Sequence, residues 1–481
     1  MEPLLNYING AFVPPRTGES LDDLNPATGE TITTVPKSGE LDVEHAVRAA
    51  NAARTAWAAT TLEERIGWLH RIADALEARS EDIARLESLD TGKPVSLARR
   101  VDAARSVSNF RFFAEHAATL EAKVFESNGA TNHVHRKPVG CVGLITPWNL
   151  PLYLLSWKVA PALVMGNTIV AKPSEMTPLT ANLLAEVLHE LNLPRGVFNL
   201  VHGLGPDVGQ AMVAHPSVHA ISFTGGTATG AIVAKTAAPM FKKLSLELGG
   251  KNATVVLEDA PLDTVLDGLV RASFTNAGQV CLCGSRILVH ERIKDTFVHG
   301  FVERVASLKV GDPTDETIDM GSVISHAHRD KVEGYIRLAM EEGGTVLTGG
   351  TSDATPVDDA HPDGAFLRPT VIDGLPIDAR CATEEIFGPV VTLHTFQNED
   401  EAVAMANATD YGLAGSVWTG DAERGHRLAQ RIDSGIVWVN TWLNRDLRTP
   451  FGGVKQSGVG REGGDWSLNF FSELSNVCVQ H

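Results

Sequence analysis

The feature that most constrains the fold of this chain is a repeated alternation of strand-like and helix-like segments after residue 139. The runs "VGCVGLIT" and "NTIVAK" are short, rich in β-branched residues and almost uniformly apolar, as is typical of strands buried on both faces. Between them lies "LPLYLLSWKVAPALVMG", which has the composition of a helix despite Pro161. Three further strand-then-glycine units follow: "VFNLVHG", "AISFTGG" and "LSLELGG". This alternation predicts a doubly wound parallel sheet that binds a ligand at the carboxyl ends of its strands.

A second alternation begins at Asn252. The runs "ATVVLE" and "RILVH" are strand-like, and helices are expected near residues 261–277 and 291–308. At 481 residues, the chain is long enough for two or three domains that each bury a core. We therefore expect a second α/β domain after the first.

Two helix starts can be placed from local signals. In "TLEERIGWLHRIADALEARS" the apolar residues recur at helical spacing, and Thr61 and Glu64 can form a capping box. Thr177 and Pro178 suit the N-cap and the first position of a later helix.

The remaining segments are less regular. A helix is expected around residues 99–118. Residues 120–139 and the tail "FFSELSNVCVQ" alternate like strands but have no helix partner, so they are expected to pair with each other or across a subunit interface. The stretch 351–365 is expected to be an exposed loop.

Composition limits the partners and the compartment. The net charge of −18 argues against nucleic acid and anionic membrane, because both need basic clusters. The N-terminus has no signal-peptide pattern, and the uncharged stretch 138–157 is interrupted by prolines, so no membrane span is expected. Five scattered cysteines favour reduced thiols in the cytoplasm over a disulfide framework.

Three segments could hold a dinucleotide. "HGLGPDVG" spaces its glycines as G-x-G-x-x-x-G, which fits the phosphate-binding fingerprint imperfectly. "FTGGTATG" is better placed, because backbone N–H groups at the start of the following helix can face a pyrophosphate. Lys172 and Glu175 of "AKPSE" follow a buried strand, and a carboxylate there favours NAD over NADP, whose 2′-phosphate it would repel. Each segment alone could equally be a structural turn or a solvated loop.

Two side chains are candidates for catalysis. Glu247 lies between apolar residues and a Gly-Gly pair, where a carboxylate tends toward a raised pKa and can act as a general base. Cys281 of "FTNAGQVCLC" is a candidate nucleophile. No further cysteine or histidine pair completes a zinc site with this C-x-C, and the histidine pairs near residues 133 and 326 are interpreted as surface or packing residues, so no metal is predicted. A capping or ion-paired glutamate and an inert thiol remain the alternatives.

Taken in order, the motifs resemble those of the NAD(P)-dependent aldehyde dehydrogenase superfamily over essentially the whole chain. They are "TPWNLP", "AKPSE", "FTGGTATG", "LELGGKN", "FTNAGQVC", "EEIFGP" and "PFGGVKQSGVGREGG". The resemblance implies an α/β aldehyde dehydrogenase fold with a Rossmann-like cofactor domain, a catalytic domain and a small β arm for oligomerisation. It assigns residues 1–119 and 140–249 to the NAD-binding domain and 250–449 to the catalytic domain. Residues 120–139 and 450–481 become bridging segments of a homodimer or homotetramer.

The same resemblance implies roles for individual residues. Cys281 becomes the nucleophile, Glu247 the general base and Asn149 the side-chain donor to the oxyanion. The implied cofactor is NAD, and its contacts are Thr146, Trp148, Lys172, Glu175, Gly225, Thr227, Glu385 and Phe387. The expected chemistry is attack of the Cys281 thiolate on an aldehyde, hydride transfer to NAD, and hydrolysis of the resulting thioester by water that Glu247 activates. A general base at Glu247 favours hydrolysis of the thioester over transfer of its acyl group to coenzyme A. Cys283 is expected to be a thiol that packs in the core.

Arginines narrow the substrate class. Arg445 and Arg448 in "WLNRDLRTPFGG" stand where many aldehyde dehydrogenases have uncharged residues, and Arg105 lies on a helix expected to flank the same entrance. Guanidinium groups suit bidentate binding of a carboxylate, although a surface salt bridge is the alternative for Arg448.

These stretches are similar to the 2-aminomuconic 6-semialdehyde dehydrogenases of tryptophan catabolism and to the 2-hydroxymuconic semialdehyde dehydrogenases of aromatic ring-cleavage pathways. That resemblance implies Arg105 and Arg445 as the carboxylate clamp. Ala103 and Ala104 depart from the Ile-Pro that relatives often have, which leaves the orientation of Arg105 less constrained.

Three other functions remain open at the level of sequence. A general aliphatic or betaine-type aldehyde dehydrogenase would prefer uncharged or cationic aldehydes. A catalytically silent binding protein would not need Cys281, Glu247 and Asn149 together, and a cofactor-free thiol hydrolase would leave Lys172 and Glu175 without a role. The choice between an aminomuconic and a hydroxymuconic substrate is not decided by sequence.

Overall fold

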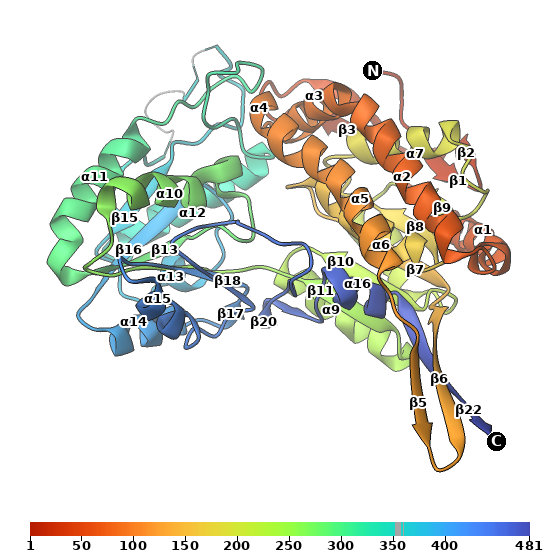
Figure 1. The fold of residues 1–481 in the computed structure, drawn as a ribbon. Helices are drawn as coiled ribbons and strands as arrows, with labels where there is room; N and C mark the ends of the chain where they lie inside the picture. The colour runs from red at the N-terminus through yellow and green to blue at the C-terminus, as the bar shows by residue number, and fades with distance from the viewer. Residues whose placement is uncertain (352–356, 359) are drawn as a thin grey trace.

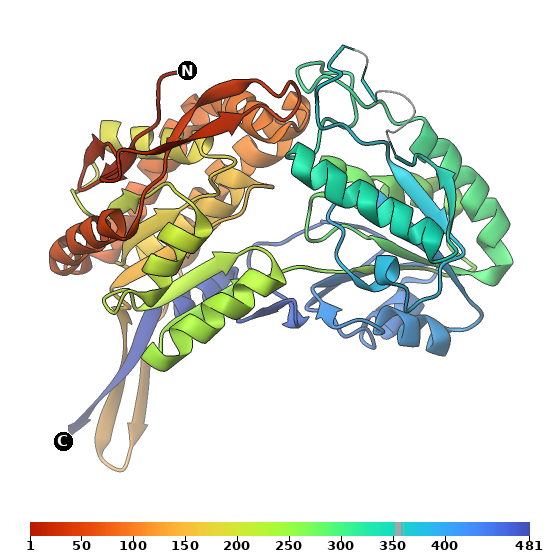
Figure 2. The same cartoon turned by 180° about the vertical axis from the view of Figure 1, so that it is seen from behind.

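The computed structural model describes residues 1–351, 357–358 and 360–481. The chain forms two lobes and a projecting arm (Figures 1 and 2). The first lobe contains most of the chain up to residue 250, the second contains residues 253–439, and the C-terminus lies at the tip of the arm. Residues 352–356 and 359, within the predicted loop 351–365, lie outside the described part of the chain. Among the described residues, no helix combines the length and the apolar character needed to span a bilayer.

The first lobe is built on an eight-stranded sheet with a parallel centre, as the alternation predicts. Its strands, in spatial order, are β2 (Ala11–Val13), β1 (Asn6–Ile8), β9 (Phe198–Leu200), β8 (Thr168–Lys172), β7 (Cys141–Ile145), β10 (Ala220–Thr224), β11 (Lys243–Glu247) and β21 (Gly458–Val459). The five strands from β9 to β11 are parallel, and the antiparallel edges come from the N-terminus and from near the C-terminus. The five strand-like runs of the first alternation therefore correspond to the five central strands. The antiparallel strands at the two edges of the sheet were not predicted.

Helices cover both faces of this sheet. They are α1 (Glu40–Ala58), α2 (Leu62–Ala78), α3 (Ser80–Thr91), α4 (Val95–Ala98), α5 (Ala104–Ala118), α6 (Pro151–Val164), α7 (Leu179–Glu190), α8 (Gln210–Ala214) and α9 (Thr227–Ala237). Along β7, Val142 and Leu144 pack with α2, α5, α6 and α7, whereas Cys141 and Ile145 pack with α1 and α8 on the other face. Because successive strand residues face opposite sides, a strand buried on both faces has to be apolar throughout.

One predicted helix start is confirmed and one is wrong by a residue. Thr61 accepts a hydrogen bond from the Glu64 backbone at 3.1 Å, and Glu64 accepts one from the Thr61 N–H at 2.6 Å, which completes the capping box of α2. Helix α7 begins at Leu179 rather than at Pro178, and Thr177 does not cap it. Its first N–H is bound instead by the buried carboxylate of Asp90, at 2.9 Å. A capping group from a distant helix gives no local signal.

The second lobe holds a seven-stranded sheet. In spatial order the strands are β14 (Thr345–Thr348), β15 (Thr370–Asp373), β16 (Val390–Phe396), β13 (Arg286–His290), β12 (Ala253–Val256), β18 (Ala414–Trp418) and β19 (Ile436–Val439), and all but β14 are parallel. Its helices are α10 (Leu262–Phe274), α11 (Lys294–Ala306), α12 (His326–Glu341), α13 (Arg380–Thr383), α14 (Glu399–Ala406) and α15 (Ala422–Ala429). The helix expected over 261–277 ends at Phe274, because left-handed residues follow.

The arm is a three-stranded antiparallel sheet made of β5 (Lys123–Ser127), β6 (Ala130–Pro138) and β22 (Ser472–Gln480). The two unpartnered strand segments therefore pair with each other, which confirms one of the two pairings expected. Helix α16 (Gly464–Phe470) leads into β22, so the chain crosses the first lobe before it reaches the arm.

Short elements complete the described part of the chain. They are β3 (Ser20–Leu24), β4 (Thr31–Pro36), β17 (Tyr411–Gly412), β20 (Val454–Lys455), the π-helical turns η1 (Arg99–Ala103) and η2 (Gly205–Gly209), and the 3-10 turns η3 (Ala238–Met240), η4 (Thr275–Gly278) and η5 (Glu291–Ile293).

Candidate active site

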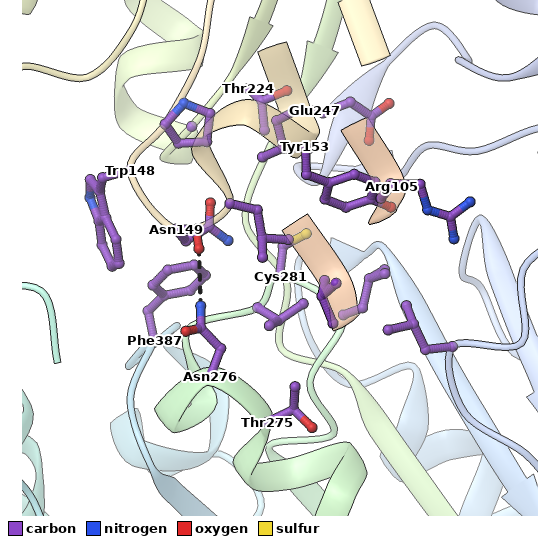
Figure 3. A pocket seen from close by; sticks show the side chains of 18 of the residues that line it. Arg105, Trp148, Asn149, Tyr153, Thr224, Glu247, Thr275, Asn276, Cys281 and Phe387 are labelled. Carbon is purple, nitrogen blue, oxygen red and sulfur yellow. Dashed lines mark hydrogen bonds between the residues drawn. The ribbon is translucent and has the colours of Figure 1, made fainter. Parts of the chain in front are cut away.

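A cavity of about 710 Å³ lies where the carboxyl ends of the first-lobe strands face the second lobe. It brings together most of the side chains selected from the sequence: Arg105, Trp148, Asn149, Gly225, Glu247, Cys281, Glu385, Phe387 and Arg445. Thr146, Lys172, Glu175 and Thr227 do not line it. In the view of Figure 3, Cys281 is central, with Trp148 and Phe387 to one side and Tyr153 and Arg105 to the other.

Cys281 is presented by a loop with an unusual backbone. Asn276, Ala277 and Gly278 have φ of 54°, 54° and 69°, so three successive residues are left-handed. A β-carbon at Gly278 would stand 2.1 Å from the carbonyl oxygen of Gly388, which requires glycine there. A left-handed alanine costs roughly 1–2 kcal/mol, and such strain is typical of functional loops. This turn ends α10 early and directs the following residues into the cavity.

Asn149 lies beside Cys281 (Figure 3), in the loop between β7 and α6. Its side-chain Nδ2 donates to the carbonyl of Gln279 at 2.9 Å. Its own backbone carbonyl accepts hydrogen bonds from Lys93 Nζ at 3.0 Å and from Asn276 Nδ2 at 3.1 Å. An amide nitrogen carries two protons, and Gln279 accepts one of them, so the second can serve an oxyanion formed at Cys281.

Glu247 ends β11 and is only 5% exposed. Neither carboxyl oxygen has a hydrogen-bond partner among the described residues. Burial, followed by the nearby carboxylate of Glu462, holds the pKa of Glu247 well above its usual range, although Lys158 and Arg445 oppose the shift. Lys158 and Glu462 themselves form a buried ion pair at 2.7 Å. A buried carboxyl with a raised pKa and free lone pairs is suited to proton transfer.

The two cysteines differ in their surroundings. Burial, and then the charge of Glu247, raises the pKa of the Cys281 thiol, so the thiol is protonated at neutral pH until a base accepts its proton. Cys283 belongs to the apolar core of the second lobe, as predicted, and burial raises its pKa to about 12. Its sulfur lies 3.8 Å from the carbonyl oxygen of Thr275 and does not line the cavity.

One wall of the cavity can receive a flat ring. Trp148 and Phe387 meet edge to face with centroids 5.3 Å apart. Phe387 has a φ of 62°, and its carbonyl contacts His328 Nε2 at 2.7 Å. Glu385 accepts a hydrogen bond from the Gly250 N–H at 2.8 Å, and a β-carbon at Gly249 would stand 2.2 Å from its carboxylate. His328, interpreted from the sequence as a packing or surface residue, packs on this wall and lines the cavity.

Residues near this wall fit a nucleotide. Helix α9 begins at Thr227 without a side-chain cap, and no atom lies within 4 Å of a β-carbon placed at Gly226. The hydroxyls of Thr146 and Thr224 are buried and have no partner among the described residues. Lys172 and Glu175, at the end of β8, form an ion pair at 2.9 Å. Free helix N–H groups, orphaned hydroxyls and an acidic group at the end of a strand match what a dinucleotide needs.

The opposite wall is cationic and aromatic. Arg445 donates from Nη1 to the Tyr153 hydroxyl at 2.9 Å, and its guanidinium lies 3.8 Å from the ring centroid of Phe451 and 4.7 Å from that of Trp157. Its Nη2 is buried and has no partner among the described residues. Arg105 lies 5.6 Å from the centroid of Tyr153 (Figure 3). A guanidinium with a free buried donor is prepared to accept a carboxylate.

Sequence reasoning missed some members of this site and left one undecided. Tyr153 holds Arg445, and its only sequence signal is a hydroxyl within the apolar run "LPLYLLS". Lys331 also lines the cavity and had no local signal. Arg448 is exposed, forms an ion pair with Asp446 at 2.5 Å and does not line the cavity, which favours the surface salt bridge.

Comparisons with known proteins agree with this geometry. The sequence model of the aldehyde dehydrogenase family matches residues 12–477. The chain is 46% identical to the 2-hydroxymuconic semialdehyde dehydrogenase of Pseudomonas sp. (strain CF600), over 100% of both chains. It is 45% identical to the 2-aminomuconic semialdehyde dehydrogenase of Homo sapiens, over 99% of this chain and 98% of the relative. A structure of betaine aldehyde dehydrogenase from Staphylococcus aureus in complex with NAD+ superposes with a TM-score of 0.96 at 39% identity, over 99% and 94% of the two chains.

Proposed function

The chain belongs to the aldehyde dehydrogenase family, and we propose that it oxidises an aldehyde that also carries a carboxylate, namely 2-aminomuconic 6-semialdehyde or 2-hydroxymuconic semialdehyde. Family membership makes it an aldehyde-oxidising enzyme that uses a nicotinamide cofactor. The substrate assignment rests on one observation above all: Arg445 presents a buried Nη2 in the wall of the cavity that contains Cys281, and this Nη2 has no partner in the part of the chain that the structure describes. The names of the muconic relatives agree with it.

In the proposed reaction, Cys281 and Glu247 act in two stages. The thiol gives its proton to Glu247 and forms a C–S bond with the aldehyde carbon. The Asn149 amide then stabilises the resulting oxyanion, a contribution of about 3 kcal/mol. A bound nicotinamide would supply the acceptor for the hydride of this tetrahedral carbon, and Cys281 would then carry a thioester. Glu247 then releases the thiol proton to solvent and takes a proton from water, whose oxygen bonds to the thioester carbon. The C–S bond breaks, the sulfur takes back a proton from Glu247, and the carboxylic acid is released. The aldehyde loses two electrons overall, and one water is consumed.

We also propose NAD rather than NADP as the cofactor. Glu175 follows the carboxyl end of β8 by three residues, in the region where the ribose of an adenine dinucleotide binds in sheets of this type. A carboxylate there accepts hydroxyl hydrogen bonds and repels a 2′-phosphate. Trp148, Glu385 and Phe387 would border the nicotinamide end, while Thr146, Gly225 and Thr227 would serve the diphosphate.

A homo-oligomer completes the proposal. The arm exposes several apolar side chains, namely Val124, Phe125, Leu474, Val477 and Val479, which are 43–60% exposed. Both of its outer strands, β5 and β22, are open edges. Exposed apolar strands with free edges favour burial against a second copy of the chain.

A substrate panel tests the carboxylate assignment. We expect Arg445→Ala to raise KM for the muconic semialdehydes by about a hundredfold, because a charge-assisted bidentate contact contributes about 3 kcal/mol. A neutral aldehyde of similar length should be affected far less. Arg448→Ala is the matched control, because that guanidinium is on the surface and should leave both substrates unchanged. The same panel run with NAD+ and NADP+ tests the cofactor preference.

If Arg445→Ala affected acidic and neutral aldehydes equally, Arg445 would not be the residue that binds the substrate carboxylate. The protein would then be an aldehyde dehydrogenase for a different aldehyde. The structural likeness to a betaine aldehyde dehydrogenase makes a cationic substrate the specific alternative. Aromatic faces bind quaternary ammonium groups, but Arg445 already covers those of Phe451 and Trp157. A preference for betaine aldehyde in the panel would restore that alternative.

A further inference from the structure

A buried lysine behind the cavity contacts the backbone of the proposed oxyanion donor. Lys93 follows α3 and is 1% exposed. Its Nζ donates to the Asn149 carbonyl at 3.0 Å and to the Asp102 carboxylate at 2.9 Å, and the Glu87 carboxylate lies at 3.7 Å. None of these three side chains lines the cavity or takes part in the proposed steps.

The Asn149 peptide is held from two directions. Lys93 and Asn276 both donate to its carbonyl, while its side chain donates to the carbonyl of Gln279, two residues before Cys281. The carbonyl and the side chain of Asn149 share one Cα, so a shift of the peptide also moves the amide relative to the thiol. We propose that Lys93 is a positioning residue that fixes the Asn149 amide beside Cys281. The inference rests on the oxyanion role proposed above for Asn149.

The surroundings of Lys93 explain why a charged donor is present. A buried ammonium is tolerated only when carboxylates pair with it, and Asp102 and Glu87 do so. Glu87 also accepts hydrogen bonds from the Leu152 N–H at 2.9 Å and from the Thr180 hydroxyl at 2.7 Å. The cluster thus joins α3, the turn η1 and the first turn of α6 to the loop that contains Asn149. A charge-assisted bond from such a rigid cluster restrains the carbonyl more strongly than a neutral one.

A double-mutant cycle tests the inference on the full-length enzyme. Lys93→Met, Asn149→Ala and the double variant are compared by pre-steady-state NADH formation, so that slow variants remain measurable. We expect Lys93→Met to slow this step tenfold to hundredfold, with KM for NAD+ unchanged, because loss of an oxyanion donor costs about 10²–10³ in kcat. The double variant should be no slower than Asn149→Ala, because the lysine then has no donor left to position.

Two further variants separate positioning from folding. Lys242→Met removes another buried lysine, whose Nζ donates to the carbonyls of Val213 and His215 at 2.6 Å each. It should lower the melting temperature without changing the rate of NADH formation. Asn276→Gly removes the second donor to the Asn149 carbonyl, keeps the left-handed backbone accessible and leaves the buried charges intact. It should slow the same step even if Lys93→Met fails to fold.

Normal rates in Asn276→Gly and in any folded Lys93→Met would overturn the inference. The inference would also be overturned if the double variant were slower than Asn149→Ala by the full factor that Lys93→Met causes alone, because the lysine would then act independently of Asn149. A fully active Asn149→Ala would contradict the oxyanion role itself, so the proposed function and the further inference fail separately.

Discussion

At the scale of single residues, the site depends on two acids whose surroundings oppose their ionisation. Glu247 and Cys281 are both buried, and burial is the largest cause of the raised pKa of each. Each group, when ionised, would also raise the pKa of the other. A state in which only one of the two groups is ionised is therefore favoured over a state in which both are. This arrangement favours transfer of the thiol proton to the carboxylate only when an aldehyde is present to take up the negative charge.

Replacing the base should separate the two stages of the reaction. We expect Glu247→Gln to lower steady-state turnover by about 10²–10⁴, because the variant lacks the general base for the attacking water. One equivalent of NADH per active site should still form, more slowly than in the parent because the thiol must then lose its proton to water, and the thioester should accumulate. Rapid mixing with NAD+ and substrate measures this burst. A variant that turns over at the parent rate would show that Glu247 is not needed for hydrolysis of the thioester.

The same variant should be more stable, and increasingly so as the pH rises. The pKa of Glu247 is raised in the folded protein, so folding favours its protonated form and stability falls as the pH rises above the unfolded value of 4.5. Glutamine removes this pH-dependent penalty. The melting temperature of Glu247→Gln should therefore exceed that of the parent by more at pH 8 than at pH 5. An equal difference at both pH values would contradict the raised pKa.

At the scale of elements, short turns place the functional groups more than helices or strands do. The left-handed turn η4 presents Cys281, and the π-helical turn η1 leads into the helix that contains Arg105. A π-turn inserts an extra residue into the helical ladder, which rotates the residues beyond it, and such turns are common at functional sites. Phe387 and Leu443 also line the cavity with positive φ.

The turn before Cys281 should not tolerate a β-carbon at its glycine. Gly278→Ala would place a methyl group 2.1 Å from the Gly388 carbonyl in a backbone conformation that disfavours alanine. We expect the variant to lose most of its activity and about 1–3 °C of melting temperature, since a clash and strain of this kind cost about 1–3 kcal/mol. Gly226→Ala, which meets open space, is the matched steric control for melting temperature. Equal melting temperatures for the two variants would contradict the close packing of the turn.

At the scale of the whole molecule, the cavity lies between two lobes and the arm extends away from both (Figure 1). The two lobes supply different functions to one site: β7, β10 and β11 end at the proposed cofactor and base, while the loop after α10 brings the thiol. The arm contributes no residue to the cavity. Its proposed role is association of subunits.

Charged residues on the arm should therefore change the oligomeric state before they change the chemistry. We expect Phe125→Glu combined with Leu474→Glu to shift the protein toward monomers, because both side chains are more than half exposed and apolar. Light scattering after size-exclusion chromatography measures the mass. The control is a pair of changes at exposed polar positions of the same strands, Lys123→Glu and Asn476→Glu. A monomeric parent protein would reject the arm as a subunit interface.

The sequence by itself determined the central strands of the first sheet and two strands of the second, limited the pairing of the arm segments to two options, and selected the candidate residues of the site. Strands buried on both faces must be apolar throughout, and such runs can be recognised locally. The thiol, the carboxyl and the amide stood out because each lay in a short motif whose order along the chain was informative. These signals require only the residues themselves and their immediate neighbours.

Tertiary structure alone decided the contacts between distant segments. Three hydrogen bonds join residues that are 56–292 positions apart in the sequence: Asp90 to the start of α7, Arg445 to Tyr153, and Lys93 to Asn149. The raised pKa of Glu247 likewise depends on burial and on Glu462, far along the chain. The surface position of Arg448 and the cavity position of Arg445, three residues apart, could not be distinguished by composition. Their different surroundings arise from packing, which local sequence does not encode.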